Sequence, residues 1–417
     1  MSAIRRLFRP ALNAAVAVLV VLVLWKPGEV AARSAGEDAT AAAARLTAFY
    51  DPPSLSLNAR AGELLRAEPM DGGLPGARAY RLLYVTTGIN GTPVASSGVA
   101  YLPDAPATEQ RPVVAWAHPT TGISRTCAPS LRDAALAGTI PGLAELIAAG
   151  NVVVATDYPG LGTPGTNAYL VGDAEGRAVL DSVRAVRALS GSGAGGAFAV
   201  FGHSQGGQAA LFTGLLAARY APELDLKGVV AAAPVTLMES ALSASRKTAL
   251  GRTIIGMTLA SWSRIYRGEH LDERAILGRF PKPFADLVLE GCLETADDLA
   301  RIERIASADT DDLLGFAGMS LFNQAPWPGL LARNTAQPLP KAVPLFVLQG
   351  GEDDIVPAIQ TRTYVERACA DGRAVEVLYQ PARNHYVIAL SNGTAIAEWI
   401  AGRFAGRPAR DDCGKPW

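Results

Sequence analysis

Hydrophobic and polar positions follow two alternating patterns from residue 80 onward. Short runs that are apolar on both faces are separated by longer stretches in which apolar residues recur at helical spacing. Runs of the first kind are typical of strands in a parallel sheet that helices cover on both faces. The pattern therefore predicts an α/β fold with a mostly parallel, eight-stranded sheet. The expected strands are 80–87, 93–102, 112–117, 151–157, 197–201, 227–233, 343–348 and 374–379.

One connection in this pattern is far longer than a loop. Residues 234–342 separate the sixth expected strand from the seventh, whereas ordinary connections have a median of about 4–6 residues. We expect residues 237–340 to form a mostly helical cap or lid, inserted into a core made of residues 33–236 and 341–417. Individual apolar side chains are expected to pack within the cap, while the cap as a whole contacts a substrate. The apolar positions at helical spacing are Ile254, Met257, Leu259, Trp262, Phe284, Leu287, Leu289, Leu313, Leu314, Phe316, Met319, Leu321 and Phe322.

The N-terminal residues have the pattern of an export signal. Arg5, Arg6 and Arg9 precede an apolar run over 12–25, and small residues allow cleavage after Ala32. The run is shorter than the ~20 residues that span a bilayer as a helix. We expect residues 1–32 to be a signal peptide and the protein to be secreted or periplasmic. An N-terminal anchor at residues 10–25 is the alternative.

Composition and charge exclude several classes of function. The net charge is −1 and no basic run lies in the body of the chain, which argues against a nucleic-acid partner. No Cys-x-x-Cys or His-x-x-x-His spacing occurs, so we expect no metal and no cofactor. At 417 residues and 49% hydrophobic content, the chain can bury a large core.

The four cysteines favour disulfide bonds in an exported chain. Spacing alone leaves three pairings open, and four unpaired buried thiols are the alternative.

The strongest candidate for chemistry is Ser204. It lies in a G-x-S-x-G pattern, residues 202–206, between an apolar strand-like run and a helix-forming stretch, 208–220. A sharp strand-to-helix turn of this kind lifts a serine hydroxyl above the sheet. With 42 glycines the pattern alone is weak, but its context favours a nucleophile over a glycine-rich turn.

A serine nucleophile needs a base, and His385 is the candidate. In this type of sheet the order along the chain is serine, acid, histidine, and His385 alone follows the last expected strand. We expect His203, beside the serine, to point elsewhere. His270 falls in the expected cap, and His118 is expected to pack and fix a loop.

The base in turn needs an orienting acid. Asp353 and Asp354 follow the expected strand 343–348. The spacing G-x-x-D-x-x-V-P favours Asp353, and adjacent side chains diverge, so only one of the two reaches His385. The alternative is that both acids solvate a loop.

Stabilisation of a tetrahedral intermediate requires hydrogen-bond donors for its oxyanion. The N–H of Gln205, the residue after the nucleophile, is one candidate. The loop 118–122 resembles the HGGG-type loop of lipases and esterases, with Pro119 in place of a glycine. Proline has no N–H, so Thr120 or Thr121 is the second expected donor.

Together these segments resemble the secretory lipase family of α/β-hydrolases, which includes the fungal lipase A type. The matching segments are 49–53, 62–69, 116–122, 127–130, 156–162 and 202–207, with the acid and histidine loops. The resemblance implies hydrolysis of carboxylic esters, including acylglycerols, by Ser204, Asp353 and His385. It places the oxyanion hole at Gln205 and at Thr121 or its neighbour. It also implies the disulfides Cys127–Cys292 and Cys369–Cys413.

We therefore expect an exported serine hydrolase that cleaves carboxylic esters through an acyl-enzyme. A serine peptidase, amidase or acyltransferase on the same fold is the nearer alternative, because a triad does not reveal the leaving group. A non-catalytic envelope-binding protein is the other, and it would be expected to have a broken triad. The expected partners are a small ester or lipid substrate and, transiently, a lipid surface. The oligomeric state is open, with a monomer expected.

Overall fold

The computed structural model describes residues 47–417 apart from 71–73, 133, 270 and 307–319. The expected signal peptide or anchor and the leader that follows it lie outside the described residues. So do His270 and four apolar positions of the expected cap, Leu313, Leu314, Phe316 and Met319. Among the described residues, no helix has both the length and the apolar composition needed to cross a bilayer.

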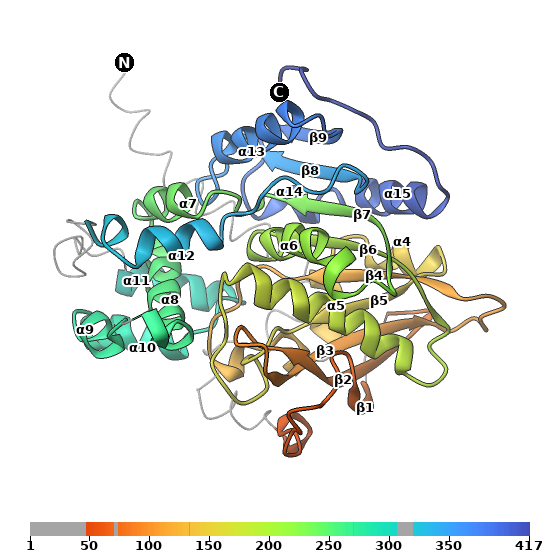
Figure 1. Cartoon of the computed structure of the whole chain (residues 1–417), viewed down its shortest axis with the longest axis horizontal. Coiled ribbons are helices and arrows are strands. Elements are labelled where there is room, and N and C mark those ends of the chain that lie inside the picture. Colours follow the sequence, from red (N-terminus) through yellow and green to blue (C-terminus); the bar gives the residue numbers. More distant parts are fainter. Residues whose placement is uncertain (1–46, 71–73, 133, 270, 307–319) are drawn as a thin grey trace.

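A single mostly parallel sheet forms the centre of the molecule (Figure 1). Its spatial order is β1-β2-β3-β5-β4-β6-β7-β8-β9. The pairs β1-β2, β2-β3 and β3-β5 are antiparallel, and all later pairs in this order are parallel. The strands are β1 (Leu64–Met70), β2 (Ala77–Thr87), β3 (Pro93–Pro103), β4 (Arg111–Ala117), β5 (Val152–Thr156), β6 (Ala194–His203), β7 (Asp225–Ala232), β8 (Leu345–Gly350) and β9 (Val375–Gln380).

The described residues thus form nine strands, one more than the sequence pattern predicts. The additional strand is β1, which lies at the edge of the sheet and pairs only with β2. Its sequence mixes charged and apolar residues and contains Pro69, which an edge strand tolerates because one side makes no ladder hydrogen bonds. It therefore lacks the apolar run on which the prediction depended. As a result the turn at Ser204 follows the sixth strand, and the long insertion follows the seventh.

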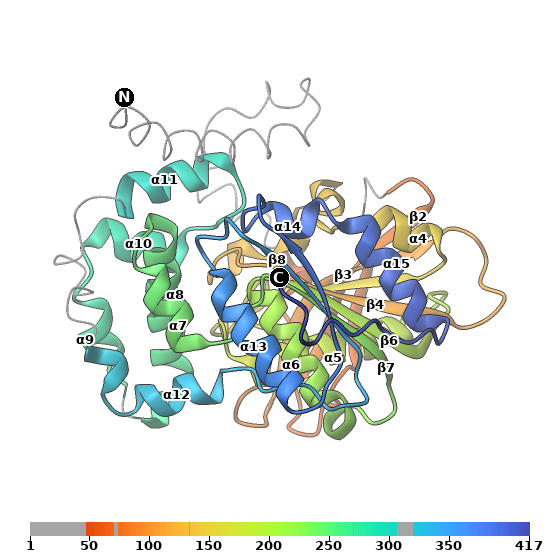
Figure 2. The same ribbon diagram turned by 90° about the horizontal axis from the view of Figure 1, so that it is seen from above.

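Helices cover both faces of the sheet (Figure 2). The central strands are accordingly apolar on both sides, and every residue of β5 is buried. One face carries α5 (Gly172–Ala188), α6 (Gln205–Tyr220) and α13 (Ala358–Ala370); the other carries α4 (Leu143–Ala148), α14 (Val387–Leu390) and α15 (Gly393–Phe404). Short 3-10 turns are η1 (Ala48–Tyr50), η2 (Arg125–Cys127), η3 (Pro129–Leu131) and η4 (Ala134–Thr139).

The described residues between β7 and β8 form helices that lie together beside the sheet (Figure 1). We call them the inserted helices. They share a hydrophobic cluster with residues 168–171 and with Ile355 and Val356 of the core. Within it the rings of Trp262 and Trp327 stack at 6.0 Å. Their bounds are α7 (Met238–Ser245), α8 (Ala249–Ile265), η5 (Arg267–Glu269), α9 (Glu273–Leu277), α10 (Lys282–Glu290), α11 (Ala296–Ala306), η6 (Ser320–Asn323) and α12 (Trp327–Arg333).

Candidate active site

Ser204 occupies a strained turn between β6 and α6. Its backbone angles are φ 56° and ψ −116°, a region that residues with a side chain rarely adopt. The flanking glycines make the turn sterically possible. A Cβ on Gly202 would lie 1.9 Å from the oxygen of Gly206, and a Cβ on Gly206 would lie 1.9 Å from the oxygen of Ala117. The turn therefore presents the serine hydroxyl at the carboxyl edge of the parallel strands.

The structure brings Ser204, His385 and Asp353 into one hydrogen-bonded chain. The Oγ atom of Ser204 lies 2.8 Å from Nε2 of His385, and Nδ1 of His385 lies 2.7 Å from Oδ2 of Asp353. All three side chains are buried, with exposed fractions of 7%, 4% and 6%. Because the carboxylate accepts a hydrogen bond from the protonated Nδ1, the unprotonated Nε2 is left free to accept the serine proton.

The backbone of the acid loop fixes Asp353 in this orientation. Its Oδ1 atom accepts hydrogen bonds from the N–H groups of Ile355 at 3.0 Å and Val356 at 2.7 Å. Gln349 donates to Oδ2 from 3.3 Å. Asp354 is exposed and makes no such contact with the histidine, so the two neighbouring carboxylates occupy different environments.

His203 does not point away from the site, contrary to the sequence expectation. Its Nε2 atom lies 2.9 Å from the main-chain oxygen of His385, and the two rings are 4.9 Å apart. A carbonyl oxygen only accepts, so Nε2 of His203 carries the proton. Burial, together with the charge of His385, lowers the pKa of His203 to about 3. His203 ends strand β6, and its side chain points toward the loop that carries His385.

The loop after β4 lies beside Ser204, as the sequence suggests. Thr120 borders the same cavity as Ser204 and Gln205, and its Oγ1 atom lies 2.8 Å from the hydroxyl of Tyr169. Oγ1 of Thr121 is buried without a partner among the described residues, and its carbonyl accepts from Leu293 at 2.9 Å. Gln205 is the first residue of α6, so its N–H has no acceptor within the helix.

Hydrogen bonds of His118 and Asp157 fix the position of this loop. Both ring nitrogens of His118 contact main-chain oxygens, at 2.6 Å to Pro119 and at 3.2 Å to Asp157. Burial lowers the pKa of His118 and raises that of Asp157. Asp157 accepts hydrogen bonds from Ser97 at 2.6 Å and from the N–H of Ser130 at 2.9 Å. His118 therefore packs and fixes the loop, as expected from sequence.

The cavity beside Ser204 is very small in this conformation. Its volume is about 20 Å³, close to the ~10–15 Å³ that one water needs. Its walls are completed by Ala241, Leu242 and Ser245 of α7 and by Ile254 of α8. Most of the apolar stripe on α8 instead packs among the inserted helices, where Met257, Leu259 and Trp262 are buried. Of that stripe, therefore, Ile254 borders the cavity beside Ser204.

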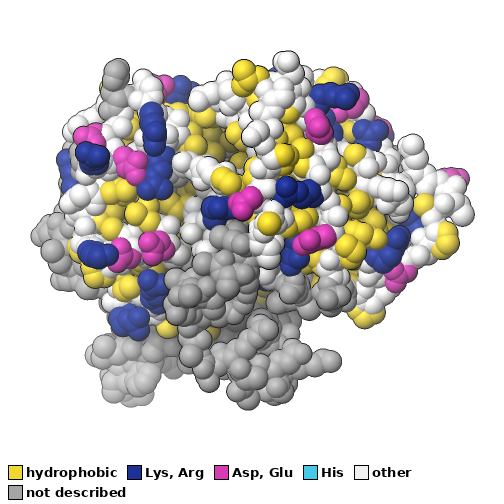
Figure 3. Space-filling model, turned by 90° about the horizontal axis from the view of Figure 1, so that it is seen from below, with side chains coloured by type: hydrophobic (Ala, Val, Ile, Leu, Met, Phe, Trp, Pro, Cys, Tyr) yellow, Lys and Arg dark blue, Asp and Glu magenta, His cyan; other side chains and the backbone are white. Residues whose placement is uncertain are grey.

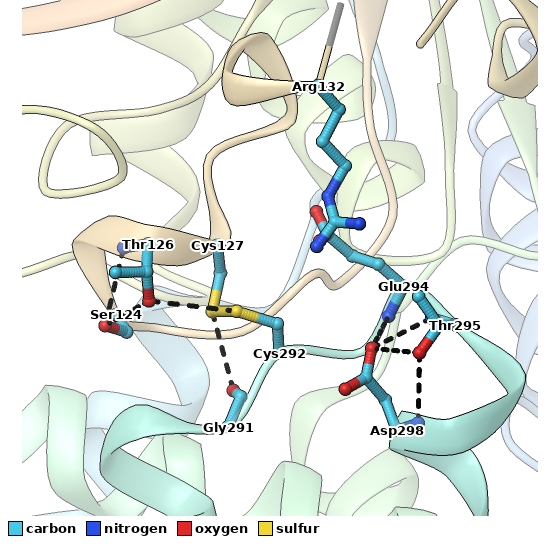
Figure 4. Close-up of a disulfide and its surroundings, with 9 residues drawn as sticks. All are labelled: Ser124, Thr126, Cys127, Arg132, Gly291, Cys292, Glu294, Thr295 and Asp298. Atoms are coloured by element: carbon cyan, nitrogen blue, oxygen red, sulfur yellow. Dashed lines mark hydrogen bonds and ion pairs between the residues drawn. A yellow bond between two sulfur atoms is a disulfide. The ribbon is translucent and has the colours of Figure 1, made fainter. Parts of the chain in front are cut away.

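A disulfide fastens the inserted helices to the loop after β4 (Figure 4). It joins Cys127 to Cys292, and Gly122 forms a β-bridge with Cys292. Close by, Arg132 forms an ion pair with Glu294. Thr295 and Asp298 cap α11 reciprocally, with Thr295 Oγ1 accepting from the Asp298 N–H at 3.1 Å and Asp298 accepting from the Thr295 N–H at 2.9 Å.

The other disulfide joins Cys369 to Cys413. It holds the C-terminal residues beside β9, where Asp412 donates its N–H to the oxygen of Val375 at 2.9 Å. Asp412 also accepts from the N–H of Val377 at 3.0 Å. The edge of the sheet is thereby covered, which blocks pairing with another chain. Both cysteine pairs are those that the family resemblance implies.

Glu175 is a residue near the site that the sequence analysis missed. It is 1% exposed, and its Oε1 atom accepts from Gln205 Nε2 at 2.7 Å. The helix α5 begins at Gly172, which places Glu175 in its first turn. The available signal is spacing, because Glu175 precedes the buried Ala178 and Val179 by three and four residues and so shares their face.

Comparisons with known proteins agree with this architecture. The model of the family described as secretory lipase matches residues 139–412. The chain is 23% identical over 391 residues to Lipase A of Moesziomyces aphidis, covering 88% of this chain and 82% of that protein. It is 24% identical over 387 residues to a probable inactive lipase of Mycobacterium tuberculosis, covering 87% and 83%. The closed state of Candida antarctica lipase A superimposes with a TM-score of 0.74 at 22% identity, covering 89% of this chain and 88% of that one. The expected α/β-hydrolase fold is confirmed.

Proposed function

The chain belongs to the secretory lipase family, and we propose on this basis that it is an exported serine hydrolase that cleaves carboxylic esters through an acyl-enzyme on Ser204. Membership of the family supports ester hydrolysis as the class of reaction. The observation that carries the finer proposal is the hydrogen-bonded chain from Ser204 through His385 to Asp353. Acylglycerols are the proposed substrate class.

In the proposed mechanism His385 acts first as a base and then as an acid. Its Nε2 atom takes the Ser204 proton as Oγ attacks the ester carbonyl, and then protonates the leaving alkoxide. Asp353 holds the imidazole by its Nδ1–H and stabilises the charged form. Water, deprotonated by the same nitrogen, attacks the acyl-enzyme and releases the acid, which restores the serine.

The oxyanion of both tetrahedral intermediates is proposed to lie between α6 and the loop after β4. The N–H of Gln205 stands at the positive end of α6, where the helix dipole adds to the hydrogen bond. Thr120 is the proposed second donor, since it borders the cavity whereas Thr121 does not line it.

We propose that residues 237–340 act as a cap over a core formed by 33–236 and 341–417. In support, α7 and α8 close the cavity above Ser204. A cavity of about 20 Å³ cannot hold an acyl chain, so the cap is proposed to open before substrate enters. Because Cys127–Cys292 ties the segment between α10 and α11 to the core, the opening is expected at α7 and α8.

Transient contact with a lipid surface is part of the proposal. Large hydrophobic side chains that are exposed include Leu57, Ile359 and Leu390. On the face shown in Figure 3, further hydrophobic side chains gather in groups among charged ones. Two disulfides and the family support export, whereas the signal peptide itself stays a prediction.

The test is hydrolysis of p-nitrophenyl esters from acetyl to palmitoyl by the full chain, beside Ser204→Ala. We expect hydrolysis that the variant loses by at least about 10⁴-fold. Activity limited to short chains would make the protein an esterase. Cleavage of amides or peptides but not esters would favour the peptidase alternative. A wild type that resembles Ser204→Ala on every substrate would instead support a non-catalytic protein, as the name of the mycobacterial relative suggests for that relative.

A further inference from the structure

Glu175 is a buried carboxyl group that the mechanism above does not use. It lies on α5, which packs along α6 (Figure 1). One of its oxygens, Oε1, accepts two hydrogen bonds, from Gln205 Nε2 at 2.7 Å and from the N–H of Leu170 at 2.9 Å. A single atom thus receives donors from two segments that are far apart in sequence.

Each of these segments leads to one side of the proposed oxyanion hole. Gln205 supplies the N–H after the nucleophile. Leu170 follows Tyr169, whose hydroxyl lies 2.8 Å from Oγ1 of Thr120. Glu175 therefore joins the two proposed donors through one hydrogen bond on the first side and through Leu170 and Tyr169 on the second.

The segment at Leu170 requires such support. Its φ of 54° is in the left-handed region, which costs a residue with a side chain of this size and persists only where the surroundings impose it. Two further contacts come from α8, where Ser261 donates to the oxygen of Asn167 at 2.7 Å and Trp262 donates to that of Tyr169 at 3.0 Å. The same segment thus contacts the inserted helices.

Glu175 has no cation among its contacts in the described residues. The charge of an ionised Glu175 would reach the hydroxyls of Tyr158, Tyr169 and Tyr266, and burial raises the pKa of all three. Its second oxygen, Oε2, is buried without a partner among the described residues. Burial raises the pKa of Glu175 to about 8, which favours the neutral carboxyl at pH 7. Since Oε1 accepts both hydrogen bonds, Oε2 is the oxygen that would carry the proton.

We propose that Glu175 is a positioning residue that holds Gln205 and the Tyr169–Thr120 pair at the spacing an oxyanion needs. This inference rests on the proposed function. The neutral acid is the competent form, because a negative charge behind the Gln205 N–H would oppose the charge that develops on the substrate oxygen.

The test compares three variants of the full chain. Glu175→Gln keeps a neutral acceptor at the same place, Glu175→Met removes it at similar volume, and Asp181→Asn alters another buried carboxyl of the same helix, bonded to Thr86 and Arg184. The kcat and KM for p-nitrophenyl butyrate are measured from pH 6 to 10, with thermal unfolding to establish the folded fraction. A second readout is the rate at which a p-nitrophenyl phosphonate modifies Ser204.

We expect Glu175→Met to lose about 10- to 100-fold in kcat with KM within about twofold, because misplacement of about 1 Å can cost that much. Glu175→Gln should restore kcat at pH 7 to within about threefold. It should also lack the fall in kcat above pH 8 that we expect for the wild type. Asp181→Asn should change only stability. Unchanged kcat in Glu175→Met, an equal loss in Asp181→Asn, or no rescue by Glu175→Gln would overturn the proposal. If the wild type hydrolyses no ester but Ser204 is phosphonylated, the proposed function is wrong, and the phosphonylation rates still test the role of Glu175. If the wild type neither hydrolyses esters nor reacts with the phosphonate, the proposed function and the role of Glu175 are both wrong.

Discussion

The imidazole of His203 donates a hydrogen bond from Nε2 to the main-chain carbonyl oxygen of His385, at 2.9 Å. The residue before Ser204 and the residue proposed to act as its base are therefore joined directly, although 182 positions separate them. This contact makes the position of the histidine loop depend on the nucleophile turn.

Loss of this contact should slow turnover without abolishing it. We expect His203→Ala to lower kcat about 5- to 13-fold, because one buried hydrogen bond contributes roughly 1–1.5 kcal/mol. His203→Gln, which can present an amide N–H, should recover part of the loss. Steady-state kinetics on a short ester would contradict the contact's role if His203→Ala turned over at the wild-type rate.

The same residue should make the fold sensitive to acid. Its pKa falls from 6.5 to about 3 on folding, so the unfolded chain binds a proton in this range that the folded chain does not. The free energy of unfolding should therefore be intact above pH 6.5 and decrease as the pH falls toward 3. Urea unfolding between pH 7 and 4 should show a weaker pH dependence in His203→Asn; an identical slope would be evidence against the shift.

Two adjacent aspartates provide a matched pair for the acid. Asp353→Asn should lower kcat by about 10⁴-fold, because the amide favours the wrong tautomer of His385. Asp354→Asn changes a side chain that does not contact the histidine and should retain kcat within about twofold. Kinetics of both variants at pH 7 decide the assignment, and a larger loss in Asp354→Asn would reverse it.

Two adjacent isoleucines of α8 allow a similar comparison for the acyl site. Ile254 borders the cavity, whereas Ile255 is fully buried among the inserted helices. Ile254→Val should shift the ratio of kcat/KM between butyrate and octanoate esters by about three- to tenfold. This lies at the lower end of the roughly 1–3 kcal/mol that one methylene contributes in an apolar pocket. Ile255→Val should cost about 1 kcal/mol of stability and leave that ratio unchanged. Equal ratios in both variants would place the acyl chain elsewhere.

The two disulfides should differ in what their removal does. Cys127→Ser with Cys292→Ser opens a loop of 165 residues and should lower the free energy of unfolding by about 2–5 kcal/mol. It should also lower kcat, because Gly122 and Cys292 are bridged beside Thr121. Cys369→Ser with Cys413→Ser opens a loop of only 44 residues, so its loss of stability should be about 1 kcal/mol smaller, with kcat retained. Chemical denaturation and ester kinetics on both variants would reveal a reversed order.

The sequence predicted the elements that depend on neighbours in the chain. The apolar runs of β4 to β9 indicate buried strands by themselves. Ser204 is marked by its flanking glycines, because a Cβ at either position would clash with the backbone of the turn. His385 was found because the order of residues along the fold leaves no other histidine after the last strand. Helix starts were less certain, since α5 begins at Gly172 without a side-chain cap to mark it.

What the sequence by itself determined is therefore the sheet, the nucleophile turn and the residues of the hydrogen-bonded chain, because each follows from local periodicity or from order along the fold. Only the tertiary structure decided that β1 joins the edge, that His203 turns toward His385, that Thr120 borders the cavity, and that Glu175 receives donors from both Leu170 and Gln205. These features depend on burial and on contacts between residues brought from distant parts of the chain. No local pattern encodes them, since desolvation and hydrogen-bond geometry exist only once the segments have packed together.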